Sequence, residues 1–179
     1  TMCGIEVEHD GENIIAIRGD KNDVLSKGNI CPKAANIGEN DFDHWRQMFL
    51  DFAHLHDVTP TPEGVARTWG WLCDPTHPET GLIVRIGEKV VGFVHYRLQP
   101  SALRGTQILY LDDLFVTETH RGSGVADDIM DRLSEIAQEH GCSAIRWDTH
   151  ATNERARRFY ERHAKNTNWI TYEMPVNSQ

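Results

Sequence analysis

The sequence predicts an α/β fold in which helices flank a mixed, mostly antiparallel sheet. Two apolar runs, 81–87 and 90–98, follow each other across a short charged link and predict a pair of antiparallel strands. Two further strand-like runs, 108–116 and 144–149, are joined through a helix. Strands connected in this way are parallel neighbours, and this parallel pair is expected to be central in the sheet.

The first third of the chain predicts a hairpin and a helix. Alternating apolar residues over 4–19 flank Asp10-Gly11, a dipeptide that suits a tight turn between strands. Asp41 is expected to cap the first helix, because aromatic residues then recur at helical spacing. These aromatic residues are Phe42, Trp45, Phe49 and Phe52.

The next elements are bounded by capping residues. Thr61 and Pro62 begin a helix that Asp74 ends, since Thr is a favoured cap and Pro is tolerated in a first turn. A polar link is expected over 99–106 between two strands. Gly141 ends a helix with an apolar stripe. The stripe consists of Val125, Ile129, Leu133, Ile136 and Ala137.

The last part of the chain predicts a short helix and a strand. Asn153 is expected to cap the helix, which carries Phe159 and Tyr160 on one side. The run 168–176 is expected to close the chain as a strand.

Composition excludes several classes of protein. The 179 residues suit one domain, and a net charge of −9 disfavours nucleic acid as a partner. No apolar run reaches the roughly 18 residues that a membrane span needs, and no signal-peptide pattern is seen. The four cysteines form no CxxC motif, so a reduced, cytoplasmic protein is expected.

The loop 119–128, THRGSGVADD, predicts an anion site between a strand and a helix. The first N–H groups of a helix lack internal partners, and the helix dipole favours negative charge there. Gly122 and Gly124 allow close backbone approach, and Arg121 suits phosphate oxygens. A turn that serves geometry alone is the alternative. The loop lacks the Gly-Lys-Ser/Thr of a Walker A motif, and Asp127 breaks a dinucleotide fingerprint.

The same loop resembles the GNAT superfamily of acetyl-CoA-dependent N-acetyltransferases. Arg121–Ala126 fits the family pattern Arg/Gln-x-x-Gly-x-Gly/Ala, and Leu111–Val116 resembles the strand before it. Trp147–His150 and the Asn-x-x-Ala-Arg-x-x-Tyr helix from Asn153 to Tyr160 resemble the next strand and helix. The resemblance covers about 35–176 and is strongest toward the branch of polyamine, small-amine and D-amino-acid acetyltransferases.

The resemblance implies direct acetyl transfer from acetyl-CoA to a primary amine of a small molecule, such as a polyamine or amino acid, without a metal. A homodimer is consistent with the family. Tyr160 corresponds to the family's tyrosine, which protonates the leaving thiolate. Its spacing alone predicts a core residue on an apolar helix face. The residues expected to bind the cofactor are Phe115, Val116, Arg121, Gly122, Ser123, Gly124, Val125, Ala126 and Asn153.

Three residues compete for the role of base. Asp112 and Asp113 are adjacent on a strand and are therefore expected to point to opposite faces. Asp112 is preferred because an acid stands there in the polyamine enzymes, and His95 is the third candidate. A non-catalytic acyl-CoA sensor is the alternative function. Asp127 stands where the family often has a basic residue. Its carboxylate must face outward if the loop is to bind CoA tightly, because it would otherwise repel the pyrophosphate.

Residues 2–33 resemble a different family, the iron–sulfur segment of molybdopterin oxidoreductases. Cys3 and Cys31 match the third and fourth cluster ligands there, but the first two ligands have no counterpart, so no cluster is expected. The predicted organisation is therefore a front segment, 1–34, and an acetyltransferase domain, 35–179.

Overall fold

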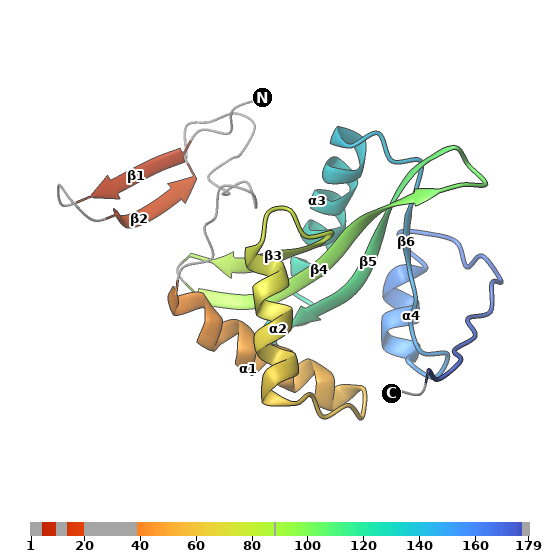
Figure 1. Cartoon of the computed structure of the whole chain (residues 1–179), viewed down its shortest axis with the longest axis horizontal. Coiled ribbons are helices and arrows are strands. Elements are labelled where there is room, and N and C mark those ends of the chain that lie inside the picture. The colour runs from red at the N-terminus through yellow and green to blue at the C-terminus, as the bar shows by residue number, and fades with distance from the viewer. Residues whose placement is uncertain (1–4, 10–13, 20–38, 88, 177–179) are drawn as a thin grey trace. The chain divides into compact units, whose positions relative to one another are not determined.

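The computed structural model describes residues 5–9, 14–19, 39–87 and 89–176, and Figure 1 shows its elements. The chain divides into two compact units, 1–147 and 148–179. In the first unit lie β1 (Ile5–His9), β2 (Ile14–Gly19), α1 (Glu39–Leu55), α2 (Pro62–Cys73), β3 (Glu79–Ile86), β4 (Lys89–Ser101), β5 (Thr106–Val116), a 3₁₀ turn (Glu118–His120), α3 (Val125–Glu139) and β6 (Ile145–Trp147). The second unit contains α4 (Glu154–Tyr160).

The main sheet has the predicted mixed topology. Its strand order is β3-β4-β5-β6. Strand β4 is antiparallel to both β3 and β5, whereas β5 and β6 are parallel. The helix α3 connects the two parallel strands, as the crossover rule requires. The α/β fold class is confirmed, but the parallel pair is not central, because β6 is an edge strand of the described sheet. The predicted N-terminal hairpin is also present, since β1 and β2 pair antiparallel in a sheet of their own.

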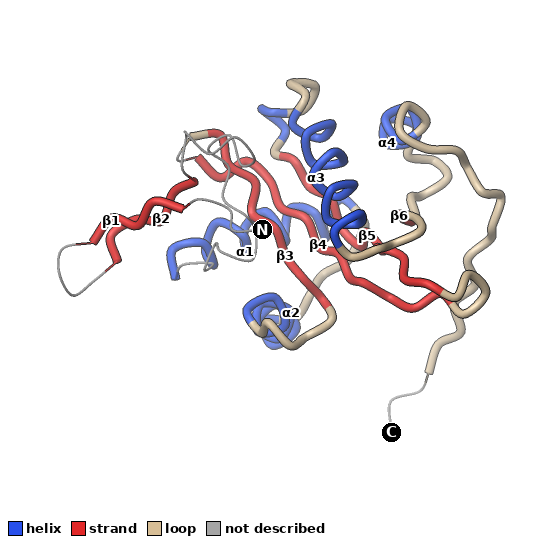
Figure 2. The backbone as a smooth tube through the Cα atoms, turned by 90° about the horizontal axis from the view of Figure 1, so that it is seen from above, coloured by secondary structure: helices blue, strands red, loops and turns tan. Residues whose placement is uncertain are grey.

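Helices cover both faces of the main sheet (Figure 2). On one face, α1 and α2 pack against β3 and β4. Their shared core consists of Trp45, Met48, Val65, Phe93 and Phe115. On the other face, α3 packs against β5 and β6 and buries the whole predicted apolar stripe. No helix among the described residues is long and apolar enough to cross a bilayer.

Capping explains where the helices begin. The Thr61 hydroxyl accepts a hydrogen bond of 3.1 Å from the Gly64 N–H, with Pro62 in the first turn. Asn153 caps α4 in the same way, accepting from the Ala156 N–H at 3.1 Å. Both predicted caps are confirmed.

Three predicted boundaries are wrong. The helix α1 begins at Glu39, so Asp41 lies within its first turn and pairs with Arg85 of β3 instead of capping. The link over 99–106 is half strand, because β4 continues to Ser101 and β5 begins at Thr106, and the turn between them is confined to 102–105, where Gly105 has φ 63°. The run 168–176 forms no strand: Asn168 has φ 60°, which interrupts an extended chain, and the apolar side chains after it are exposed.

Candidate active site

A β-bulge in β5 brings two carboxylates to one face of the sheet. His95 pairs with Asp113 and Tyr96 pairs with Leu111, so Asp112 is an extra residue without a partner on β4. Asp113 contacts His95, and Asp112 contacts Arg97 two residues farther along β4. Residues two apart in a strand share a face. The expectation that the two aspartates face opposite ways is therefore wrong, because a bulge interrupts the alternation.

Asp112 belongs to a cluster with two residues that the sequence did not single out, Glu79 and Arg97. Glu79 lies directly opposite Arg97 in the β3–β4 register. Nη1 of Arg97 contacts Oδ1 of Asp112 and lies 3.8 Å from Oε2 of Glu79. Oδ2 of Asp112 is buried and has no hydrogen-bond partner among the described residues. Sequence reasoning missed Glu79 because it began the strand two residues too late.

The cluster favours a protonated carboxyl group near neutral pH. Burial and the charge of Asp112 raise the pKa of Glu79 to about 7, and Arg97 only partly opposes them. Burial also raises the pKa of Asp112, again against the effect of Arg97. A proton on one of the two carboxyl groups removes the repulsion between them. A carboxyl pair of this kind can take up and release protons near neutral pH.

His95 joins the α1 helix to the bulge. Its side chain is 3% exposed, and its Nδ1 lies 2.8 Å from Oδ2 of Asp113. On the other side, the indole N–H of Trp45 donates to Nε2 of His95 at 2.9 Å. The three side chains thus form one chain of hydrogen bonds that runs from the aromatic core to the sheet.

Beyond the bulge, one edge of β5 carries no strand. The parallel strand β6 pairs only with Leu109–Leu111. The remainder of β5, 112–116, pairs with β4 on one side alone within the described sheet. Phe115 and Val116, the expected pantetheine contacts, lie in this stretch. Backbone groups on this edge, other than the Val116 carbonyl that accepts from Arg121, can pair with an amide-containing chain that lies alongside as an added strand.

The predicted phosphate loop follows directly. Gly122 and Gly124 have φ of 82° and 94°, and a side chain added at either would meet no atom within 4 Å. Both positions therefore need glycine for their conformation, and open space surrounds them. Ser123 closes the turn by donating to the His120 carbonyl at 2.7 Å. Val125 is buried at the start of α3, and Ala126 follows it in the first helical turn.

Arg121 is held at the end of β5. Its Nε donates to the Val116 carbonyl at 3.0 Å, and its guanidinium lies 5.7 Å from the centre of the Phe115 ring. Its backbone N–H is bonded to the Glu118 carbonyl, so in this conformation Arg121 can offer a phosphate its side chain and not its backbone N–H. Of the two following aspartates, Asp128 is exposed and Asp127 is half-buried.

Asn153 and Tyr160 lie in the second unit. Tyr160 is half-buried at the end of α4, and burial raises the pKa of its phenol. The phenol therefore remains protonated at neutral pH and can donate a proton. The structure brings Asp112, Phe115, Val116 and the loop together within the first unit. The association of Asn153 and Tyr160 with them stays a prediction from the family resemblance.

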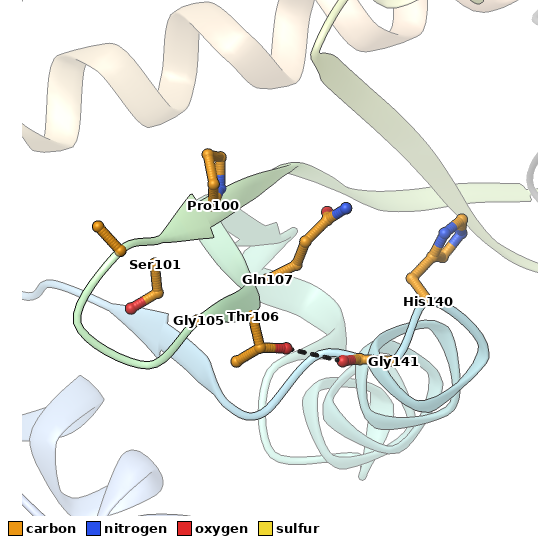
Figure 3. Close-up of a pocket in the computed structure, with 8 residues that line it drawn as sticks. Pro100, Ser101, Gly105, Thr106, Gln107, His140 and Gly141 are labelled. Carbon is orange, nitrogen blue, oxygen red and sulfur yellow. Dashed lines mark hydrogen bonds between the residues drawn. The ribbon is translucent and has the colours of Figure 1, made fainter.

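Other parts of the described structure lack comparable features. Figure 3 shows an open pocket between the β4–β5 turn and the end of α3, where Thr106 donates to the Gly141 carbonyl. It lies at the far end of α3 from the loop, and a helix of this length spans roughly 22 Å. No group of three or more His, Cys, Asp or Glu side chains among the described residues could hold a metal, His54 and His56 included.

Comparisons with known proteins identify the family. The sequence model of the acetyltransferase (GNAT) family matches residues 42–164 and thus continues across both units. The model of the molybdopterin oxidoreductase Fe4S4 domain matches residues 1–40. Cys3 and Cys31 lie outside the described residues, so the expected absence of a cluster stays a prediction.

Individual relatives are acetyltransferases. The chain is 27% identical over 138 residues to the D-amino-acid N-acetyltransferase HPA3 of Saccharomyces cerevisiae, covering 76% of this chain and 86% of that protein. It is 35% identical over 75 residues to a thialysine N-epsilon-acetyltransferase of Bos taurus, which covers 42% of this chain and 44% of that protein. A crystal structure of ribosomal-protein-alanine N-acetyltransferase from Brucella melitensis shares the fold, with a TM-score of 0.65 and 24% identity over 76% of this chain and 94% of that one. The chain therefore belongs to the acetyltransferase (GNAT) family and is an acetyl-CoA-dependent N-acetyltransferase.

Proposed function

We propose that this acetyltransferase moves the acetyl group of acetyl-CoA directly onto a primary amine of a small molecule, of the polyamine or amino-acid class. The observation that carries the proposal is the continuity of three features in the first unit. The carboxylates at the bulge, the unpaired edge of β5 and the glycine loop at the start of α3 follow one another along the chain. Together they provide places for an amine, a pantetheine arm and a pyrophosphate.

The amine class follows from charge. Glu79, Asp112 and Asp113 bring three carboxyl groups to a site with one guanidinium, that of Arg97. Such a balance favours a cationic ammonium group over an anionic acceptor. Two relatives are named as a D-amino-acid and a thialysine acetyltransferase, and these names support a small amine as the acceptor.

The proposed cofactor contacts follow the family pattern. The pantetheine amides lie beside Phe115 and Val116, on the edge of β5 that has no neighbouring strand in the described sheet. The pyrophosphate lies on the loop 121–126, with backbone N–H groups at the start of α3 and the Arg121 side chain as donors. Asn153 completes the contact to the cofactor.

The reaction then needs one proton acceptor and one donor. Asp112, in its deprotonated form beside Glu79, removes a proton from the ammonium, and the neutral amine attacks the thioester carbonyl carbon. The C–S bond breaks as the C–N bond forms, and the CoA thiolate takes a proton from Tyr160. The nitrogen of the new amide then gives up its second proton, which restores the Tyr160 phenol. General acid and base groups of this kind each contribute roughly 10²–10⁴ in rate.

The experiment is amine-dependent release of CoA thiol from acetyl-CoA by the full chain. The panel includes spermidine, L- and D-amino acids and lysine analogues, with matched alcohols as controls for N-transfer. We expect turnover with at least one primary amine and none with its alcohol. Saturable CoA binding without turnover on any amine would instead identify a non-catalytic acyl-CoA sensor.

Size-exclusion chromatography with light scattering tests the expected homodimer.

A further inference from the structure

We propose that Trp45 and His95 are positioning residues that hold the Asp113 carboxylate at the bulge, so that His95 is not the base. His95 is a natural candidate for a base, since histidine is the commonest proton acceptor in catalysis. Its hydrogen bonds in this structure rule out that use of the ring.

The tautomer of His95 follows from its partners. The indole nitrogen of Trp45 can only donate, so Nε2 of His95 must accept and carries no proton. The proton of the neutral ring is then on Nδ1, which faces Oδ2 of Asp113 at 2.8 Å. The contact is therefore a hydrogen bond from a neutral ring to a carboxylate. A proton added to Nε2 would replace the Trp45 bond with a clash between two N–H groups.

Burial prevents substrate from reaching the ring. His95 is 2% exposed, and the rings of Trp45, Phe49 and Phe93 lie within 6.0 Å of its centre. Both ring nitrogens are already bonded to protein. Asp113, by contrast, is 28% exposed at its side chain, so its carboxylate reaches the surface while His95 fixes it from behind.

This arrangement separates the roles of the two aspartates. Asp113 is held by a neutral donor as an oriented negative charge, suited to anchor an ammonium group. Asp112 lies against Arg97 and the protonatable Glu79 and is left to exchange the proton. This division of roles rests on the proposed function, whereas the tautomer and the bond to Asp113 do not.

Nuclear magnetic resonance of the full chain with ¹⁵N-labelled histidine tests the structural part. The His95 resonances are assigned by their loss in H95N. We expect an unprotonated Nε2 and a slowly exchanging, downfield proton on Nδ1 that moves upfield in D113N. A proton on Nε2, or a charged ring at neutral pH, would overturn the proposal whether or not the protein acetylates any amine.

A matched pair of variants tests the kinetic part. In H95N the asparagine amide reaches the position of the wild-type Nδ1 and can still donate to Asp113. In H95Q the glutamine amide reaches the position of Nε2, so it keeps the bond from Trp45 and loses the one to Asp113. We expect kcat to fall about 10- to 100-fold in H95Q and much less in H95N, with the KM for acetyl-CoA unchanged in both. Equal losses in the two variants, or wild-type kcat in H95Q, would contradict the positioning role.

Discussion

The carboxyl group of Glu79 on β3 lies 3.8 Å from the guanidinium of Arg97 on β4, at directly paired positions of the sheet. Arg97 also contacts Asp112, so a single cation lies between two carboxyl groups that both have a raised pKa. The site therefore holds a proton near neutral pH that an ordinary pair of surface carboxylates would have lost.

The first prediction concerns the pH dependence of activity. The pair must be deprotonated before it can accept a proton, so kcat/KM is expected to rise with pH through about 7, the pKa of Glu79. In Glu79→Gln this rise should move to lower pH, because the like charge of Glu79 beside Asp112 is gone. A profile measured from pH 5 to 9 with saturating acetyl-CoA makes the comparison. An unshifted profile in Glu79→Gln would mean that another group titrates.

The same carboxyl makes a stability prediction with a defined sign. Folding raises the pKa of Glu79 from 4.5 to about 7, so in this interval the folded state binds more protons than the unfolded state. The contribution of Glu79 to stability is therefore lost as pH rises from about 4.5 to 7. Urea unfolding at both ends of this interval should show the loss in wild type and not in Glu79→Gln. Parallel pH curves for the two proteins would count against the raised pKa.

Loss of the hydrogen bond from Trp45 to His95 is expected to lower the free energy of unfolding. Trp45→Phe removes the donor and leaves Nε2 of His95 buried without a partner, which costs about 1–3 kcal/mol beyond the lost packing. Trp71→Phe is the matched control, since Trp71 is 42% exposed. Urea titration of both variants tests this, and equal midpoints would show that the hydrogen bond contributes nothing.

The loop predicts an effect on cofactor affinity. Gly124→Ala forces a side chain into φ 94°, a strain of about 1–2 kcal/mol, and we expect weaker CoA binding by roughly tenfold. Gly70→Ala is the control, because Gly70 is helical and an added Cβ there meets no atom within 4 Å. Isothermal titration with CoA measures both. If Gly124→Ala binds as wild type does, the loop is only a structural turn.

The sequence allowed the local features to be predicted. Helix caps at Thr61 and Asn153, the stripe on α3 and the glycine loop depend on neighbours a few residues apart, and all are present. The bulge at Asp112 could not be predicted, because it depends on the register between β4 and β5. The bond from Trp45 to His95 joins residues 50 apart in sequence, and no local pattern marks it. The missing strand over 168–176 shows that alternation alone does not supply a partner strand.

The measurement that most directly tests the account is amine-dependent thiol release by wild type and by Asp112→Asn, with the CoA dissociation constant measured on the same samples. We expect wild type to turn over with a primary amine and Asp112→Asn to lose about 100-fold or more in kcat while CoA binding is unchanged. Equal turnover by both proteins, or release that does not depend on the amine, would contradict base-assisted acetyl transfer at the bulge.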